Sequence, residues 1–164
     1  MNKIQINEKA DFLIKKSKKS GADSVDVVYI ENTNIDVGCR LKKIEKLERS
    51  ESNDLGLRFI KNKKQVIVSS NDLTKKSLEE LIFKASKMVE AVPKDPYCSI
   101  AKKKDIIKKI PNLEIFDNKE PSIKSLKDKV IEAESAGLNV KGVTNSEGAE
   151  IGWNKSKIYL FNSN

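Results

Sequence analysis

Two runs of alternating side chains joined by a short polar turn constrain the fold of this chain more than any other feature. Leu55, Leu57 and Phe59 alternate with glycine, arginine and isoleucine, and the strand-like residues 65–70 follow directly after the polar residues 61–64. Alternation with a period of two is typical of a strand with one buried face. A turn this short joins antiparallel neighbours. The chain is therefore expected to contain an antiparallel sheet.

Three segments before this hairpin also have strand character. Residues 24–30 are rich in β-branched side chains, and residues 35–41 alternate between apolar and polar side chains. Residues 44–49 are another strand candidate, although their spacing is also compatible with a helix. The polar residues 31–34 and 50–54 are predicted to be turns between these strands. Together the segments predict an antiparallel meander.

Two helices are predicted to back this sheet. The first extends from about Asn7 to Ser20. The second begins at Thr74, or at Ser77, which can form a capping box with Glu80, and it ends before Pro93. Its apolar residues recur at helical spacing, which predicts that it packs across one face of the sheet: Leu78, Leu81, Ile82, Ala85, Met88 and Val89.

Residues 94–121 differ in composition from the rest of the chain and are predicted to be a linker. All four prolines lie in this segment or just before it, and it has a run of three lysines and little periodicity. The linker divides the chain into an amino-terminal α+β domain at residues 1–93 and the start of a second, incomplete domain at residues 122–164.

The second domain is expected to open with a helix capped by Ser122 and to continue into strands. One strand is predicted over residues 142–153, with a turn at Glu147-Gly148, and another over residues 157–161. Because the chain stops directly after a strand, the sheet of this domain is expected to be unfinished. The predicted fold class is α+β: an antiparallel β-sheet meander backed by helices, followed by a partial second α+β unit.

The net charge of +8 raises nucleic acid or an anionic membrane surface as partners. Only three of the 32 basic residues are arginine, the residue that suits bidentate contacts with bases and phosphates. The lysines are spread over several predicted elements without interleaved aromatic residues, so specific nucleic-acid binding is disfavoured. No stretch resembles a secretory signal or a membrane span. With Cys39 and Cys98 far apart, a reducing cytoplasm and free thiols are expected.

No residue pattern in the chain predicts a catalytic, cofactor-binding or metal site. There is no histidine, no paired-cysteine motif and no glycine-rich phosphate loop. Cys39 is interpreted as a small core residue on the apolar side of a strand. Cys98 is expected to be more exposed, in the linker, but no histidine is present to activate it. We therefore expect no catalytic residue, no cofactor-binding residue and no metal ligand.

Several other residues have both a structural and a functional interpretation. Gly56 lies inside a strand, which predicts either close packing beneath the helix above it or a close approach by a peptide or partner chain. Trp153 is interpreted as a core residue of the second unit rather than part of a binding site. The carboxylates of two acidic groups are expected to face solvent: Glu45, Glu48, Glu51, Glu147 and Glu150.

In their order, several segments resemble the amino-terminal region of the TldD/PmbA family, on its PmbA (TldE) side. No single segment is specific, but their order and spacing support a resemblance over essentially the whole chain. The matching stretches are GADSVDVV from Gly21, SNDLGLR from Ser52, VSSNDL from Val68, DPYCSIA from Asp95, VTNSEGA from Val143 and IYLFNSN from Ile158.

The resemblance implies a cytoplasmic bacterial or archaeal protein. In this family two types of subunit pair into a peptidase that degrades unfolded or small peptides. The zinc site lies on a histidine-glutamate-x-x-x-histidine helix in the carboxy-terminal part of the TldD-type subunit, and PmbA-type subunits lack it. An older family label is modulator of DNA gyrase. No catalytic or zinc-binding position of the family falls within this chain.

From the resemblance we expect a truncated or split PmbA/TldE-like protein of a metallopeptidase family that is not catalytic by itself. It would support proteolysis of peptides by a zinc-bearing TldD-type subunit in a hetero-oligomer, or self-associate, without a membrane. Zinc is expected only in the TldD-type partner. Two alternatives stay open: a basic nucleic-acid-binding module and a non-functional gene remnant.

Overall fold

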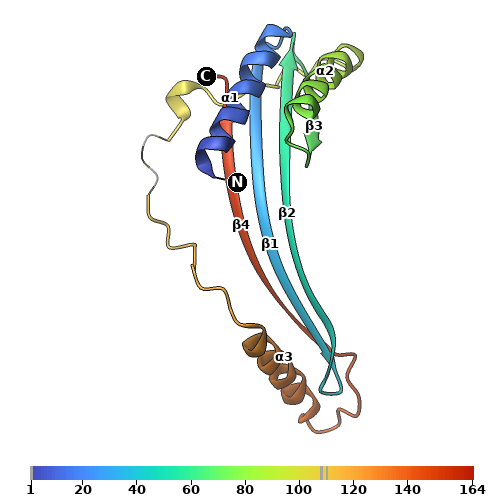
Figure 1. Cartoon of the computed structure of the whole chain (residues 1–164). Coiled ribbons are helices and arrows are strands. Elements are labelled where there is room, and N and C mark those ends of the chain that lie inside the picture. The colour runs from blue at the N-terminus through green and yellow to red at the C-terminus, as the bar shows by residue number, and fades with distance from the viewer. Residues whose placement is uncertain (1, 108, 110) are drawn as a thin grey trace. The chain divides into compact units, whose positions relative to one another are not determined.

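The computed structural model describes residues 2–107, 109 and 111–164. The sheet has the strand order β3-β2-β1-β4 (Figure 1). This antiparallel sheet with its helices confirms the predicted α+β class. Along the chain the elements are α1 (Lys3–Lys19), β1 (Ser24–Arg40), β2 (Lys43–Lys61), β3 (Lys64–Ser70), α2 (Lys75–Ala91), the short 3-10 helix η1 (Lys103–Asp105), α3 (Ile123–Leu138) and β4 (Ala149–Asn162).

The chain forms two compact units that are discontinuous in sequence. Unit 1 combines Met1–Glu31, Asn53–Ile110 and Lys157–Asn164, and unit 2 combines Asn32–Ser52 with Pro111–Ser156. The strands β1, β2 and β4 contribute residues to both units.

These units do not follow chain order, whereas the domains predicted from the sequence do. The predicted division into residues 1–93, 94–121 and 122–164 places each strand wholly in one domain. Composition along the chain does not reveal that a long strand is shared between two compact regions. The domain boundaries at residues 93 and 121 remain a prediction.

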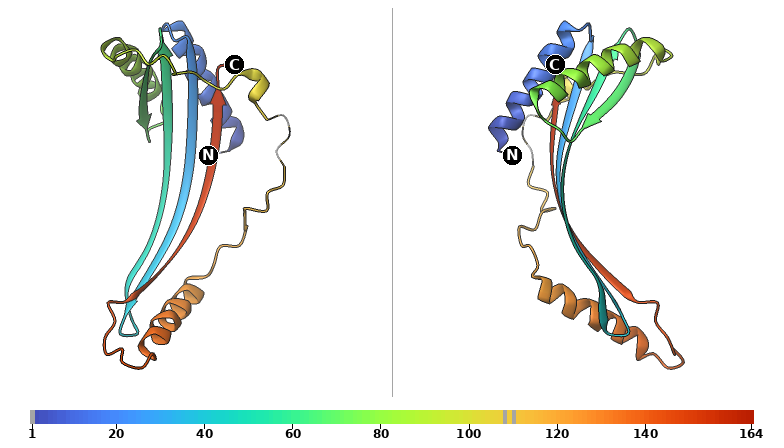
Figure 2. Two further views of the ribbon diagram at one scale, coloured as in Figure 1. Left: turned by 180° about the vertical axis from the view of Figure 1, so that it is seen from behind. Right: turned by 45° about the vertical axis from the view of Figure 1, so that its right-hand side comes forward.

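In unit 1, α1 and α2 pack on one face of the sheet (Figure 2). The odd-numbered residues of β1 and β2 point into this core, because side chains alternate between the two faces of a strand. Asn2 caps α1 through a capping box with Gln5, and Gly21 follows the helix with a φ of 94°. The core residues include Ile6, Ala10, Leu13, Val25, Val27, Leu57, Phe59, Val66, Leu78, Leu81 and Val89.

The predicted hairpin at residues 55–70 is confirmed. β2 and β3 pair from Leu55 with Ser70 to Lys61 with Lys64. The two residues between these strands, Asn62 and Lys63, have positive φ values of 51° and 59°. Two consecutive residues of this kind are typical of the tight turns that match the twist of a hairpin.

The helix after this hairpin begins at the first of the two predicted caps. Thr74 accepts a hydrogen bond from the backbone N–H of Ser77, and α2 then continues to Ala91, two residues before Pro93. The predicted stripe is buried except at Met88, which is 43% exposed.

The turns predicted at residues 31–34 and 50–54 are wrong, because β1 and β2 run through these segments without interruption. The strands predicted at residues 142–153 and 157–161 are likewise one strand, β4, and the residues at Glu147-Gly148 precede it. The polar residues 31–34 and 50–54 thus lie within strands, and Glu147-Gly148 lies directly before one. None of these stretches divides a predicted pair of strands.

These polar residues bond to one another across three neighbouring strands. Amide and hydroxyl side chains of β1 are paired with those of β2 and β4 in unit 2, and cross-strand pairs of this kind stabilise a sheet. The bonds run from Asn34 Nδ2 to Ser50 Oγ at 3.3 Å, from Asn154 Nδ2 to Asn34 Oδ1 at 2.5 Å and from Ser156 Oγ to Asn32 Oδ1 at 2.6 Å.

The helix of unit 2 starts where the sequence predicts. Ser122 caps α3 by accepting a hydrogen bond from the backbone N–H of Ser125. The core of this unit contains Ile35, Val37, Cys39, Leu126 and Val130, with half-buried Ile151 and Trp153 packed against them. The prediction that Trp153 belongs to this core is confirmed.

Candidate functional site

The face of the unit 1 sheet opposite the helices is the candidate site, and we call it the open face. Because Tyr159 and Phe161 pack against the helix-side core, the residues next to them in β4 point to the open face. The exposed fractions are 77% for Leu160 and 70% for Ile67 of β3. Exposed apolar side chains that gather on one surface mark binding sites more often than isolated ones do.

A groove of about 490 Å³ crosses this open face. It is lined by Asp26, Val27, Val28, Gly56, Arg58, Ile67, Ala101, Leu160, Phe161 and Asn162. Its residues come from all four strands of unit 1 and from the segment after α2. Val27 and Phe161 pack into the helix-side core, so the apolar side chains on this face are those of Val28, Ile67, Ala101 and Leu160. Such a lining suits a protein surface or an apolar ligand better than a charged small molecule.

Gly56 lies in this groove, on the side of the sheet away from α1 and α2. A Cβ atom at this position would lie 2.9 Å from Cγ1 of Val28 on the neighbouring strand. The expectation that Gly56 makes room for the helix above it is therefore wrong, because its neighbour is a side chain of the open face. The alternative, an approach by a peptide or partner chain, stays a prediction.

The polar part of the groove is an ion pair that is satisfied internally. Nε of Arg58 donates to Oδ2 of Asp26 at 2.8 Å, and a terminal nitrogen of Arg58 donates to the same oxygen. Arg58 also donates to the carbonyl of Ser99 at 3.1 Å. The pair leaves little net charge in the groove.

The segment after α2 already covers one part of the open face, and we call residues 95–101 the strap. Cys98 and Ile100 are buried against Ile60 of β2. The backbone N–H of Asp95 donates to the carbonyl of Lys63 at 2.6 Å. The expectation that Cys98 is exposed is wrong, because the strap inserts its apolar side chains into the sheet face.

The other cysteine is a core residue, as predicted. Cys39 is 3% exposed, and its thiol donates to the carbonyl of Val130 at 3.4 Å. Burial, reinforced by the nearby Glu134 carboxylate, raises the pKa of the Cys39 thiol. This thiol is therefore poorly suited to act as a nucleophile.

The predicted solvent-facing carboxylates are exposed: Glu45, Glu48, Glu51, Glu147 and Glu150. In the part of the chain that the structure describes, no three His, Cys, Asp or Glu side chains are grouped closely enough to hold a metal ion. A hydrolytic zinc site needs about three such ligands. The described residues therefore do not fit a zinc centre, and the absence of metal ligands from the whole chain stays a prediction.

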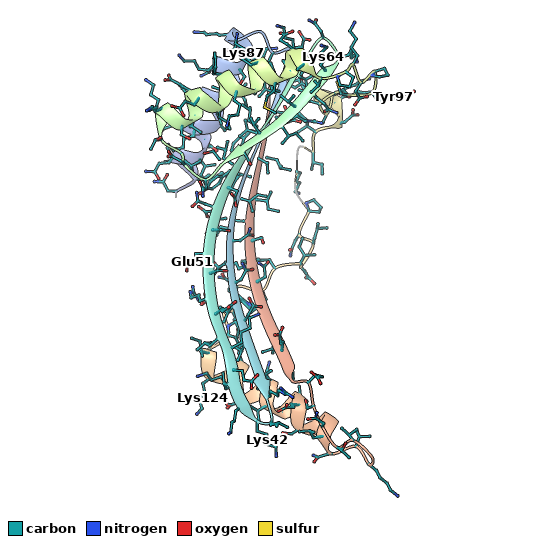
Figure 3. All side chains as sticks on the ribbon, turned by 90° about the vertical axis from the view of Figure 1, so that its right-hand side faces the viewer. Lys42, Glu51, Lys64, Lys87, Tyr97 and Lys124 are labelled. Atoms are coloured by element: carbon teal, nitrogen blue, oxygen red, sulfur yellow. The ribbon has the colours of Figure 1, made fainter. Side chains whose placement is uncertain are left out.

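Lysines gather at one end of unit 1, although the sequence suggested that they are spread out. Lys61, Lys63, Lys64 and Lys94 line a second pocket of about 410 Å³. Figure 3 shows Lys64 and Lys87 at this same end. Glu90 also lines the pocket, and the hydrogen bond that Nζ of Lys61 donates to it at 2.6 Å lowers the pKa of its carboxyl.

The open face is not among the features predicted from the sequence, although the sequence contains a signal for it. The strand residues 27–28, 59–60 and 66–68 are consecutive apolar residues instead of strictly alternating ones. Continuous apolar runs are typical of strands that are covered on both faces. Applied to these short runs, that criterion would have predicted a second apolar face.

The fold and the open face define the class: an α+β domain that presents an apolar sheet surface and that, among its described residues, has no group of metal-ligating side chains. Residues 25–89 match the family described as PmbA/TldA metallopeptidase domain 1. The metalloprotease PmbA of Escherichia coli O157:H7 is 26% identical over 131 residues, which are 79% of this chain and 29% of that protein. The chain is thus similar to PmbA/TldD-family proteins, and residues 25–89 match the first domain of that family.

Solved structures share the fold. A protein from Bacteroides thetaiotaomicron VPI-5482, described as a modulator of DNA gyrase, has a TM-score of 0.78 and 22% identity over 99% of this chain and 38% of its own. TldE from Thermococcus kodakarensis has a TM-score of 0.74 and 20% identity over 94% of this chain and 35% of its own. The chain thus spans about a third of the length of its relatives.

Among the helices that the structure describes, none combines the length with the apolar character needed to cross a membrane.

Proposed function

We propose that this chain is a PmbA/TldE-type component, not catalytic by itself, that supports the proteolysis of peptides by a zinc-bearing TldD-type subunit. The observation that carries the proposal is the match of residues 25–89 to the first domain of this metallopeptidase family. In this proposal the chain works in the cytoplasm, and its task is to hold a partner or to form part of the wall around the peptide.

The side chains available as zinc ligands in this chain support a non-catalytic role. The sequence has no histidine, and its two cysteines are both buried. A zinc peptidase also requires a positioned base beside the metal-bound water. In our proposal the metal and this base belong to the TldD-type partner.

The proposal is tested by mixing the purified chain with the TldD-type subunit of the same organism. Gel filtration with light scattering measures association, and an unfolded peptide with a fluorescent reporter measures hydrolysis with and without a chelator. We expect a complex, chelator-sensitive hydrolysis by the complex, and no hydrolysis by the chain alone. No association, or chelator-sensitive hydrolysis by the isolated chain, would contradict the proposal.

The lysine-rich end of unit 1 favours one alternative, a nucleic-acid-binding module. The strap begins beside this pocket, because the backbone N–H of Asp95 donates to the carbonyl of Lys63. The strap residue Tyr97 is 90% exposed and offers a ring on which a base could stack. Binding of this kind weakens steeply with salt because counterions are released. A fluorescence titration of the chain with single-stranded DNA at low and moderate salt tests this alternative, and absent binding at low salt removes it.

A further inference from the structure

The pocket at the β2–β3 hairpin of unit 1 is strongly basic, and we call it the lysine pocket. Four lysines against one glutamate leave its lining a net charge of +3. It is separate from the groove of the open face, since the two share no lining residue. Its volume is about 410 Å³, and it is lined by Lys61, Asn62, Lys63, Lys64, Val89, Glu90 and Lys94.

The turn that carries Lys63 is held from two sides. The backbone N–H of Asn62 donates to Oδ2 of Asp23 at 2.6 Å, and the carbonyl of Lys63 accepts the backbone N–H of Asp95 at 2.6 Å. The carboxylate of Asp95 accepts a hydrogen bond from Nε2 of Gln65 at 3.0 Å. The backbone beside the pocket is therefore fixed, and the carboxylates that fix it bond to donors other than the lysines.

Two of the lysines already have partners at the end of α2. Nζ of Lys61 donates to the carboxylate of Glu90 at 2.6 Å, and Nζ of Lys64 donates to the backbone carbonyl of Glu90 at 2.8 Å. An ammonium group has three N–H donors, so Lys64 keeps two of them. In the part of the chain that the structure describes, the exposed Lys63 and Lys94 make no ion pair. The pocket thus offers two free ammonium groups and part of a third.

The chemistry of this lining selects one class of anion. Lysine is a flexible point charge with rotatable donors, which suits carboxylates at variable spacing. Sites for single-stranded nucleic acid combine basic residues with aromatic rings and arginines on which bases stack. Among the described residues that line the pocket there is neither an arginine nor an aromatic residue. The lining therefore fits the carboxylates of an unfolded chain better than the bases and phosphates of a nucleic acid.

We propose that the lysine pocket binds acidic stretches of unfolded peptides through Lys63, Lys94 and the remaining donors of Lys64. This inference rests on the proposed function, in which the complex acts on unfolded peptides, and it names the kind of peptide that this chain retains. The glutamates and aspartates of the peptide pair with the free ammonium groups. Glu90 competes with them, because its carboxylate already holds Lys61.

The test titrates the full chain with two rhodamine-labelled peptides of glycine and serine. One peptide carries a run of glutamates, and the other carries glutamines at the same positions. Fluorescence anisotropy measures binding at low and at physiological salt. We expect the glutamate peptide alone to bind, and to bind several times more weakly at physiological salt, because the Debye length falls from about 30 Å at 0.01 M to about 8 Å at 0.15 M.

Two double variants of equal net charge locate the site. Lys63→Glu with Lys94→Glu reverses the free charges of the pocket, and Lys124→Glu with Lys129→Glu makes the same change at exposed positions of α3 in unit 2. Circular dichroism melting curves establish that both variants fold like the parent chain. The pocket variant should bind the glutamate peptide at least about tenfold more weakly at low salt, since local charge concentrates an oppositely charged ligand by this order. The α3 variant should bind almost like the parent.

A third variant, Glu90→Gln, should strengthen binding, which a loss of structure cannot do. The side chain of Glu90 is 59% exposed, so the fold does not depend on burying it. The substitution removes the negative charge from the lining and releases Nζ of Lys61 for the peptide. We expect a severalfold tighter affinity for the glutamate peptide at low salt and no change for the glutamine peptide.

The proposal is overturned by any of the following results: no binding of the glutamate peptide by the parent, equal binding of the two peptides, equal affinities of the two double variants, an unchanged affinity in Glu90→Gln, or tighter binding of single-stranded DNA of the same charge. The titration needs no TldD-type subunit. If the chain binds acidic peptides but fails to associate with that subunit, the proposed function falls and the lysine pocket stands. The opposite pair of results removes only the lysine pocket.

Discussion

The carboxylate of Glu134 accepts a hydrogen bond from the backbone N–H of Lys42 at 2.7 Å. Its other oxygen accepts the backbone N–H of Leu41 at 2.8 Å. Leu41 and Lys42 form the turn between β1 and β2, and their φ values are 48° and 62°. Neither residue is glycine, so this turn is strained and depends on neighbouring contacts that hold it in place. A buried carboxylate on α3 thus holds the hairpin of unit 2 in this conformation.

The stability of the chain should depend on the ionisation of Glu134. The hydrogen bond from Lys42 is the main cause that lowers the pKa of this carboxyl from its ordinary value of 4.5. A carboxyl whose pKa is lower in the folded state stabilises the fold above its ordinary pKa, and this contribution is lost as the pH falls through the folded value. We expect the melting temperature to fall below pH 4.5 more steeply in the parent than in Glu134→Gln. Parallel curves for the two proteins would contradict this assignment.

Gly148 should tolerate no side chain. Its φ is +115°, and a Cβ atom there would lie 2.6 Å from the carbonyl oxygen of Cys39. We expect Gly148→Ala to lower the free energy of unfolding by about 1–3 kcal/mol, because it combines a steric clash with an unfavourable backbone conformation. The matched control is Gly137→Ala in α3, where a Cβ would meet nothing within 4 Å. That change should be neutral or stabilise by up to about 1 kcal/mol in urea unfolding curves.

Local sequence patterns were enough to predict the hairpin at residues 55–70, α2 and the cap of α3. These elements are decided by neighbours within a few residues. The long strands were not predicted, because the polar residues near Asn34 and Ser50 are typical of turns when each strand is considered alone. Their hydrogen bonds join residues 16 or more positions apart, and such pairing is visible only once the strands are aligned.

The packing of Gly56 and of Cys98 in the candidate site was predicted wrongly for a related reason. The sequence indicated a close contact at Gly56, but the contacting side chain, Val28, lies on another strand. The strand pairing that brings the two residues together is not local in the sequence. Cys98 seemed exposed because proline-rich segments are usually surface connections. The strap buries it through contacts with Ile60, which is 38 positions away in the numbering.

The core of unit 1 should depend strongly on Phe59. This side chain is 0% exposed and lies on the helix side of β2. Phe59→Ala should destabilise the chain by about 3–5 kcal/mol, because it removes a large buried side chain and leaves a cavity. Phe83→Ala is the matched control, since Phe83 is 65% exposed on α2. Its effect should stay within about 0.5 kcal/mol. Similar unfolding midpoints for the two variants would contradict the assignment of Phe59 to the core of unit 1.

The two thiols should react at different rates although both are buried. Cys39 lies in the core of unit 2, where burial raises the pKa of its thiol, so it should react with a disulfide reagent only when the unit unfolds. Cys98 lies in the strap and is buried only in a small cluster with Ile60 and Ile100. A segment with few apolar contacts opens locally more often than a core strand. We expect one thiol to be modified well before the other in native buffer. Cys98→Ser should remove the faster phase and Cys39→Ser the slower one, and a faster phase that survives Cys98→Ser would contradict this order.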